Sequence, residues 1–191
     1  MKLVLASTSP FRKALLEKLD LKFETDSPDI DETPQSDESI ESMVKRLSEA
    51  KARAIAENHP HSLVIGSDQS ASLHSKILHK PGNFDVAFQQ LKAASGETIT
   101  FYTGLCLLNT ETGNAETVCE AYTVKFRDLT DEEIEAYLRK EEPYNCAGSF
   151  KSEALGISLF EHMRGDDPNS LIGLPLIALC RLLKAQGQPV L

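Results

Sequence analysis

The chain has 191 residues, 41% of them hydrophobic, which is enough to bury one sizeable core. Its formal net charge is −9, with 29 acidic residues against 20 dispersed basic ones, a balance that argues against a nucleic-acid duplex as partner. No low-complexity linker, signal peptide pattern or long apolar span is apparent, so we expect a single domain over residues 1–191, in the cytoplasm and without a membrane partner.

Alternating strand and helix patterns run along the chain and predict an α/β class with a mixed sheet. We expect, in order, a strand at 2–6, a helix at 10–19, a short strand at 21–25, a helix at 39–57, a strand at 62–73, a helix at 83–94, a hairpin of 97–108 with 115–126, a helix at 131–140, a short strand near 155–160 and a helix at 175–185.

Four cysteines are present without a CxxC pair, and the five histidines are not spaced as their partners. Buried free thiols in a reducing compartment are therefore a better account than a metal site for Cys106, Cys119, Cys146 and Cys180.

The first candidate site lies where the first strand leads into the first helix. Ser9 suits the N-cap and Pro10 the first helical position, where a missing N–H costs nothing. Arg12 and Lys13 follow at once, so two cations stand near free helix N–H groups that themselves attract anions. This pattern predicts a phosphate-binding site, although Ser-Pro capping with solvated cations would look the same in this segment.

The second candidate site is Asp68, which the run Ile65-Gly66-Ser67-Asp68-Gln69 places at the end of an apolar strand. A carboxylate able to bind a divalent cation or polarise water, and Lys80 able to neutralise a phosphate, are the groups that nucleotide hydrolysis requires. Glu32, in a polar turn, and Lys51, on the polar face of the 39–57 helix, could join them. Each of these could instead form a surface ion pair.

Together these segments resemble the Maf family of nucleotide pyrophosphatases over nearly the whole chain. The resemblance rests on the order and spacing of Ser7-Thr8-Ser9-Pro10-Phe11-Arg12-Lys13, Asp31-Glu32-Thr33, Lys51-Ala52, Gly66-Ser67-Asp68-Gln69, Lys80-Pro81, Ser95-Gly96, Tyr102-Thr103-Gly104, Ala147-Gly148-Ser149 and Gly173-Leu174-Pro175.

The resemblance implies an elongated mixed sheet flanked by helices, a cleft between two lobes, and cleavage of a nucleoside triphosphate to monophosphate and diphosphate. It also implies a divalent cation, Mg²⁺ or Mn²⁺, and a possible homodimer. The implied roles are catalysis and metal binding for Asp68, help with metal or water for Glu32, and phosphate contacts for Ser9, Arg12, Lys13, Lys51 and Lys80.

Phe11, Gln69 and Glu153 separate the chain from the commoner branch of the family, which resembles dTTP and UTP pyrophosphatases. The chain instead resembles the branch that acts on 7-methyl-GTP, although that branch usually carries tryptophan where Phe11 stands. An aromatic face attracts the positive charge of a methylated guanine, and a carboxylate can accept from the ring N1–H and the exocyclic amine together.

Other interpretations stay open at this point. Phe11 could pack against the sheet, and Glu153 could pair with Lys151 on the surface. The same site could hydrolyse dTTP, UTP or another modified nucleotide, or the protein could be a nucleotide-binding regulator of cell division.

Overall fold

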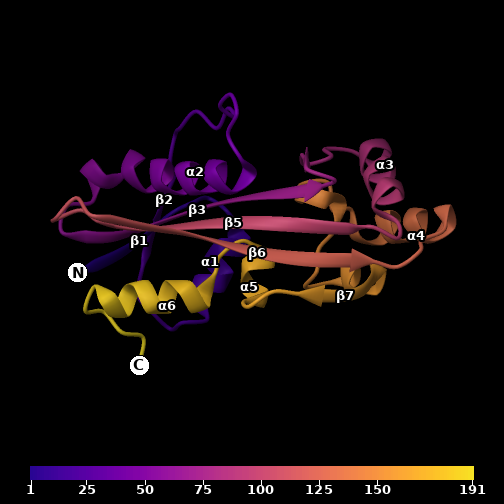
Figure 1. Ribbon diagram of the computed structural model, residues 1–191. Helices are drawn as coiled ribbons and strands as arrows, with labels where there is room; N and C mark the ends of the chain where they lie inside the picture. Colours follow the sequence, from indigo (N-terminus) through magenta and orange to yellow (C-terminus); the bar gives the residue numbers. More distant parts are fainter. The chain divides into compact units, whose positions relative to one another are not determined.

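The structure is a computed structural model that describes all residues from 1 to 191 (Figure 1). Its strands are β1 (Lys2–Ala6), β2 (Glu24–Asp26), β3 (Ser62–Leu73), β4 (Lys76–Leu78), β5 (Thr98–Asn109), β6 (Ala115–Phe126) and β7 (Phe160–Arg164). Its helices are α1 (Pro10–Glu17), α2 (Ile40–Ala54), α3 (Phe84–Ala94), α4 (Asp131–Glu141), α5 (Pro168–Ile172) and α6 (Leu176–Ala185), with short 3₁₀ turns η1 (Ala56–Asn58), η2 (Ala147–Ser149) and η3 (Leu155–Leu159).

The strands form a seven-stranded mixed sheet in the order β2-β1-β3-β5-β6-β7, with β4 on β3. Strand β1 is parallel to both of its neighbours, whereas β4 and β7 are antiparallel to theirs. A mixed sheet flanked by helices confirms the predicted fold class. The chain divides into two compact units: unit 1 comprises residues 1–69, 102–120 and 167–191, and unit 2 comprises residues 70–101 and 121–166. The single-domain assignment stays a prediction.

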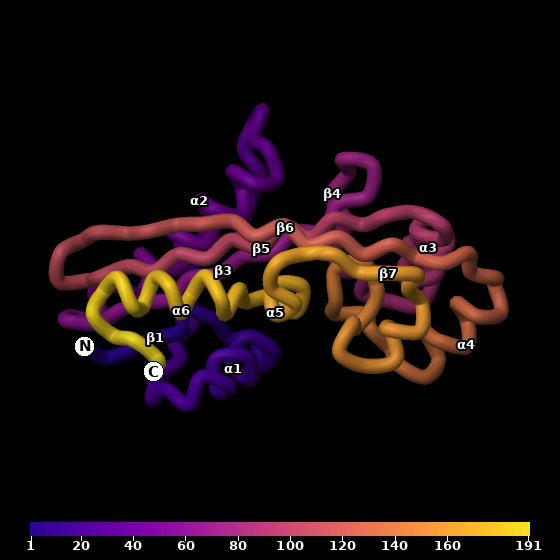
Figure 2. The backbone as a smooth tube through the Cα atoms, turned by 60° about the horizontal axis from the view of Figure 1, so that its bottom comes forward, coloured from indigo at the N-terminus to yellow at the C-terminus, as the bar shows by residue number.

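Helix α2 lies on one face of the unit 1 sheet and helices α1 and α6 on the other (Figure 2). Apolar side chains are buried on both faces. Successive residues of β1 point to opposite faces: Leu3 and Leu5 pack with α1 and α6, and Val4 and Ala6 with α2. Burial on both faces explains why β1 is a continuous apolar run, as parallel strands commonly are.

Unit 2 is organised by an aromatic cluster. The ring of Phe150 lies edge-on to Phe101, Phe126 and Phe160, with centroid distances of 5.4, 5.5 and 4.9 Å. Such edge-to-face pairs add to the free energy gained by burial itself. The cluster anchors the polypeptide on both sides of the segment from 151 to 159.

Most predicted elements are confirmed, because their signals are local. Ser9, Ser39, Asn83 and Thr130 cap α1, α2, α3 and α4 with their side chains, and Thr130 forms a capping box with Glu133. Gly113, at a positive φ of 74°, turns the chain between β5 and β6.

Four predicted boundaries are wrong by two residues or more. The helix expected at 39–57 ends at Ala54, and the 3₁₀ turn η1 follows it. The first helix ends at Glu17 rather than Leu19, and the second strand is residues 24–26 rather than 21–25. The apolar run at 155–159 is the 3₁₀ turn η3, and the strand begins only at Phe160.

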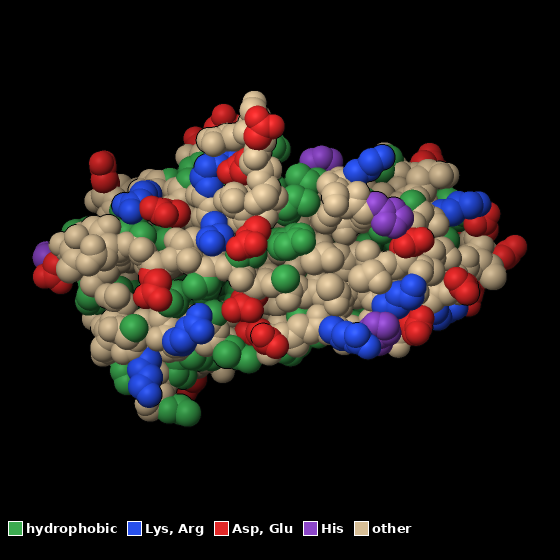
Figure 3. Space-filling view, viewed as in Figure 1, with side chains coloured by type: hydrophobic (Ala, Val, Ile, Leu, Met, Phe, Trp, Pro, Cys, Tyr) green, Lys and Arg blue, Asp and Glu red, His purple; other side chains and the backbone are tan.

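The exposed charges alternate in sign on the face shown in Figure 3, where Lys and Arg side chains stand among Asp and Glu. None of the helices is long and apolar enough to span a bilayer. All four cysteines are free, but only Cys106 is fully buried, so the expectation of four buried thiols is wrong for Cys119, Cys146 and Cys180.

Candidate active site

Two glycines bring α2 unusually close to the sheet. A Cβ on Gly66 of β3 would lie 2.0 Å from the Ser48 carbonyl oxygen, and a Cβ on Gly104 of β5 would lie 2.3 Å from the Val44 carbonyl oxygen. No real side chain tolerates such contacts, so the helix approaches because these positions lack one. The polar side chains of α2 can therefore reach strand β3.

Asp68 lies in the interior of the twelve-residue β3, not at its end as the sequence pattern predicted. The buried hydroxyl of Ser48 accepts a hydrogen bond from the Asp68 backbone N–H at 2.9 Å and donates one to the Val44 carbonyl at 2.6 Å. Helix α2 thus fixes the backbone of Asp68 through a satisfied buried hydroxyl.

Lys51 joins the two candidate catalytic carboxylates. Its Nζ lies 2.6 Å from Asp68 Oδ1 and 2.7 Å from Glu32 Oε1. The sequence pattern placed Lys51 on the polar face of α2, but the side chain is buried, because the close helix approach carries this position over the sheet. Asp68 is also buried, whereas Glu32 remains mostly exposed. The ammonium group thus neutralises carboxylates from two separate segments.

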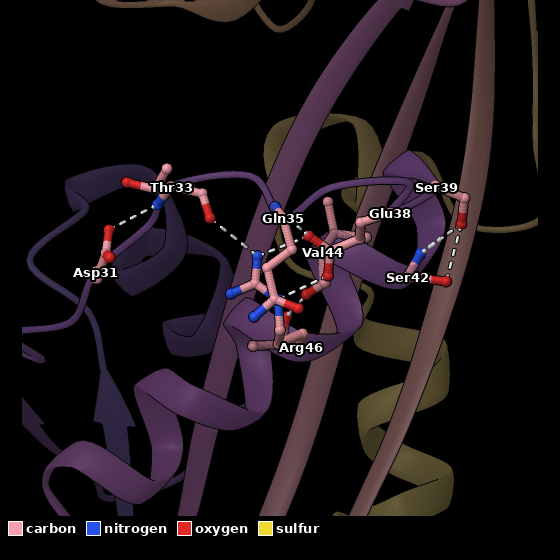
Figure 4. Close-up of polar contacts among 9 residues, drawn as sticks. Asp31, Thr33, Gln35, Glu38, Ser39, Ser42, Val44 and Arg46 are labelled. Atoms are coloured by element: carbon pink, nitrogen blue, oxygen red, sulfur yellow. Dashed lines mark hydrogen bonds and ion pairs between the residues drawn. The ribbon is translucent and has the colours of Figure 1, made fainter.

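Arg46 of α2 holds the segment that carries Glu32 (Figure 4). Its guanidinium forms a two-point contact with Glu38, from Nε to Oε1 at 2.6 Å and from Nη2 to Oε2 at 2.7 Å, and Nη2 also donates to the Thr33 carbonyl at 3.2 Å. The arginine holds the pKa of Glu38 below its usual range. Because Thr33 is adjacent to Glu32, the contacts of Arg46 help to hold Glu32 beside Lys51.

Arg12 is oriented by a carbonyl from the far end of the sequence. Its Nε donates to the Gly173 oxygen at 2.9 Å, and the buried Ser67 hydroxyl approaches the same oxygen at 3.0 Å. Gly173 has φ 128°, a backbone conformation that favours glycine. Burial lowers the pKa of Arg12, and the negative charges of Asp68 and Glu32 partly oppose that shift. Arg12 therefore belongs to the same electrostatic cluster.

The other residues at the start of α1 differ in exposure. Ser9 accepts from the Arg12 backbone N–H at 3.4 Å. The ring of Phe11 is 38% exposed, so it is not simply packed against the sheet. Lys13 lies 3.8 Å from Glu17 in an exposed i,i+4 pair.

Gln69 contacts helix α5, which directly precedes Gly173. Its Nε2 approaches Thr103 Oγ1 at 3.0 Å and the carbonyl oxygens of Ser170 and Leu171 at 2.8 and 3.0 Å. In this geometry the amide contacts the backbone of α5.

Lys80 and Glu153 belong to unit 2, where both side chains are exposed. The alternative that Glu153 pairs with Lys151 is wrong, because Lys151 Nζ pairs with Glu141 at 3.0 Å. Glu153 accepts a hydrogen bond at 3.3 Å from the hydroxyl of neighbouring Ser152.

The donor set at Lys51 suits a magnesium or manganese ion that arrives with a phosphate ligand. Asp68 and Glu32 supply hard carboxylate oxygens that already converge on one cationic group. No group of three or more His, Cys, Asp or Glu side chains is placed to hold an ion without further ligands. Mg²⁺ is commonly held in this way, by one or two carboxylates plus substrate phosphates.

Several positioning residues were not anticipated from the sequence. Ser48, Arg46 and Glu38 carry no local signal for their roles, since each depends on how α2 packs. The five-residue helix α5 was missed although Asp167 and Pro168 are an N-cap and first-turn pair.

Comparison with known proteins shows similarity over nearly the whole chain. A family model described as Maf-like protein matches residues 2–186. A protein named 7-methyl-GTP pyrophosphatase from Nitrosococcus oceani is 57% identical over 189 residues, which are 99% of this chain and 95% of that protein. Another of that name, from Alcanivorax borkumensis, is 55% identical over 185 residues, 97% of this chain and 94% of the relative. The chain therefore belongs to the Maf-like protein family.

Proposed function

We propose that this protein hydrolyses 7-methyl-GTP to 7-methyl-GMP and diphosphate, in the cytoplasm. The observation that carries the proposal is the cluster in which Lys51 joins Asp68 and Glu32, with Arg12 in the same electrostatic environment. Two relatives that share more than half of its residues bear the name of that activity.

The cations of the site would bind the phosphates. Arg12 uses Nε for the Gly173 carbonyl, which orients the guanidinium and leaves its two terminal nitrogens to grip phosphate oxygens. Lys51 would exchange a carboxylate contact for a phosphate oxygen. Ser9, Lys13 and Lys80 would complete the phosphate contacts, in keeping with the family resemblance.

Asp68 would act as the base. In-line attack of water on the α-phosphorus forms one P–O bond and breaks the bond to the departing diphosphate, while a proton leaves the water. Once phosphate oxygens attract the Lys51 ammonium, an Asp68 oxygen can accept that proton. Asp68 and Glu32 would hold Mg²⁺ or Mn²⁺, whose charge stabilises the polyphosphate.

Base selection would depend on Phe11 and Glu153. The exposed ring of Phe11 can stack on a methylated, positively charged guanine, and the exposed Glu153 carboxylate can accept from its N1–H and exocyclic amine. Gln69 would contribute by holding the α5 backbone.

The test is diphosphate release from 7-methyl-GTP, GTP, dTTP and UTP, each with Mg²⁺, with Mn²⁺ and with a chelator. We expect the highest kcat/KM with 7-methyl-GTP and no turnover with the chelator. A preference for dTTP or UTP would agree with the proposed hydrolysis of a nucleoside triphosphate but contradict 7-methyl-GTP as the substrate. Tight binding of every nucleotide without turnover would favour a nucleotide-binding regulator. Light scattering on the same preparation tests the possible homodimer.

A further inference from the structure

In unit 2, the segment from Lys151 to Leu155 is attached to helix α4 at both ends. At its start, the Lys151 backbone N–H donates to the Tyr137 hydroxyl at 3.2 Å. At its end, the Leu155 backbone N–H donates to Glu141 Oε2 at 3.2 Å. Tyr137 and Glu141 are four residues apart on α4, so they lie on the same face of the helix.

Both carboxylate oxygens of Glu141 are used by this segment. While Oε2 accepts from Leu155, Oε1 pairs with Lys151 Nζ at 3.0 Å, and the same Nζ donates to the Glu141 carbonyl at 3.2 Å. The pair is largely shielded, with side-chain exposures of 27% for Lys151 and 16% for Glu141. Shielding makes such a contact stronger than the exposed ion pairs elsewhere on α4.

The segment also closes on itself. The Ala154 N–H donates to the Lys151 carbonyl at 3.3 Å, and a Cβ on Gly156 would lie 2.3 Å from that carbonyl oxygen. Glu153 lies within this closed turn, and its exposed carboxylate takes no part in the attachment to α4.

We propose that Glu141 is a positioning residue that holds the Glu153 carboxylate in the orientation needed to read the guanine base. The inference rests on the proposed function, because it needs Glu153 to be the base reader. Glu141 touches neither substrate nor metal in this scheme. It acts by binding Lys151 and Leu155, at the two ends of the turn that carries Glu153. The hydrogen bond from Lys151 to Glu141 raises the pKa of Lys151.

The test is Glu141→Gln, measured as kcat/KM for 7-methyl-GTP relative to UTP. The Lys151 and Leu155 donors approach different oxygens of Glu141. In glutamine one of these oxygens becomes an NH2 donor and the negative charge that attracts the Lys151 ammonium is lost. Uracil offers one N–H between two carbonyls, so it gains little from Glu153. We expect the ratio to fall about 5- to 50-fold through a higher KM for 7-methyl-GTP, because the competent orientation is less populated. Kinetics with UTP should change less than twofold.

Two further variants distinguish positioning from general damage. Glu135→Gln removes another α4 carboxylate, which pairs with Arg139 and does not touch the segment, so its ratio should equal that of the parent protein. Glu153→Gln should lose the preference for 7-methyl-GTP, and adding Glu141→Gln to it should lower the ratio no further. If Glu141→Gln folds poorly, Lys151→Met breaks the same ion pair and should give the same loss.

The outcomes separate this inference from the proposed function. If Glu153→Gln keeps the preference, base reading by Glu153 fails and the inference with it. If Glu153→Gln loses the preference while Glu141→Gln and Lys151→Met do not, the function stands and the inference is overturned. An equal fall for both nucleotides, or a further fall of the ratio in the double variant, would mean that Glu141 does not act through Glu153.

Discussion

At the scale of single residues, the site is built around a buried lysine. A buried ammonium is costly unless it is paired, and Lys51 is paired twice, with Asp68 and Glu32. The same pairing keeps two carboxylates close together. In the proposed mechanism, exchange of ammonium contacts for phosphate oxygens would couple nucleotide binding to release of the carboxylates.

Replacing Asp68 by Asn should remove turnover and spare binding. The amide cannot accept the proton of the attacking water, and a general base commonly contributes about 10²- to 10⁴-fold. We therefore expect kcat for 7-methyl-GTP to fall at least about 100-fold, with the nucleotide Kd changed far less. Rapid-quench kinetics and calorimetric titration measure the two quantities. Near-normal kcat would show that Asp68 is not the base.

Replacing Phe11 by Ala should affect the methylated nucleotide selectively. A cation–π contact contributes about 0.5–2 kcal/mol, so kcat/KM for 7-methyl-GTP should fall about 2- to 30-fold more than that for GTP. Phe11→Trp is the matched control, and its larger ring should preserve or strengthen the preference. Equal losses for both nucleotides would argue against stacking on the charged base.

At the scale of elements, the packing of α2 on β3 and β5 decides where the candidate catalytic groups lie. Gly66 and Gly104 permit the approach, Ser48 then reaches the Asp68 backbone, and Lys51 reaches its carboxylate. Arg46, from the same helix, restrains the segment of Glu32. Helix α2 thus positions Asp68, Lys51 and Glu32.

Replacing Gly66 by Ala should damage stability and catalysis together. The new methyl group would meet the Ser48 carbonyl at 2.0 Å, and overpacking of this kind commonly costs about 1–3 kcal/mol. We expect a lower free energy of unfolding in urea and a lower kcat, because α2 must move away from Asp68. Gly113→Asn is the control, since nothing lies within 4 Å of a Cβ there and asparagine tolerates its positive φ. An unchanged kcat in Gly66→Ala would contradict the positioning role of α2.

Element boundaries were predictable where a cap or a turn residue marks them. Ser9, Ser39, Asn83 and Thr130 begin helices as expected, because a side chain capping a nearby N–H is a local interaction. The strand expected near 155–160 failed because apolar content alone does not distinguish a strand from a turn. There, closure of the chain at Gly156 produces a 3₁₀ turn, and pairing with β6 begins at Phe160.

At the scale of the whole molecule, burial of a thiol makes the free energy of unfolding depend on pH in the alkaline range. Burial raises the pKa of Cys106 from 9.0 to about 11. Below pH 9 the thiol is protonated in both folded and unfolded chains, so it adds no pH dependence. Between about pH 9 and pH 11 the unfolded chain loses this proton first, and the free energy of unfolding falls.

The Cys106→Ala variant isolates this effect from other alkaline titrations. At pH 10 the Cys106 contribution should be roughly 1 kcal/mol, following the linkage of about 1.4 kcal/mol per pKa unit. Urea unfolding at pH 8 and pH 10 should show a smaller pH-dependent loss in the variant than in the parent protein. Equal losses would mean that the thiol ionises alike in folded and unfolded chains.

Local signals in the sequence predict the fold class, most helices and the long strands, and the sequence carries a family resemblance that the comparisons confirm. These depend on local capping, turn chemistry and hydrophobic periodicity, which act over a few residues. Three contacts depend on the tertiary structure. Lys51 is buried between two carboxylates, and the Gly173 carbonyl orients Arg12 across 161 positions of sequence. Glu141 binds both ends of the turn that carries Glu153. The physical reason is that such contacts depend on how closely packed elements approach, and the absence of a Cβ at Gly66 and Gly104 sets that distance for α2.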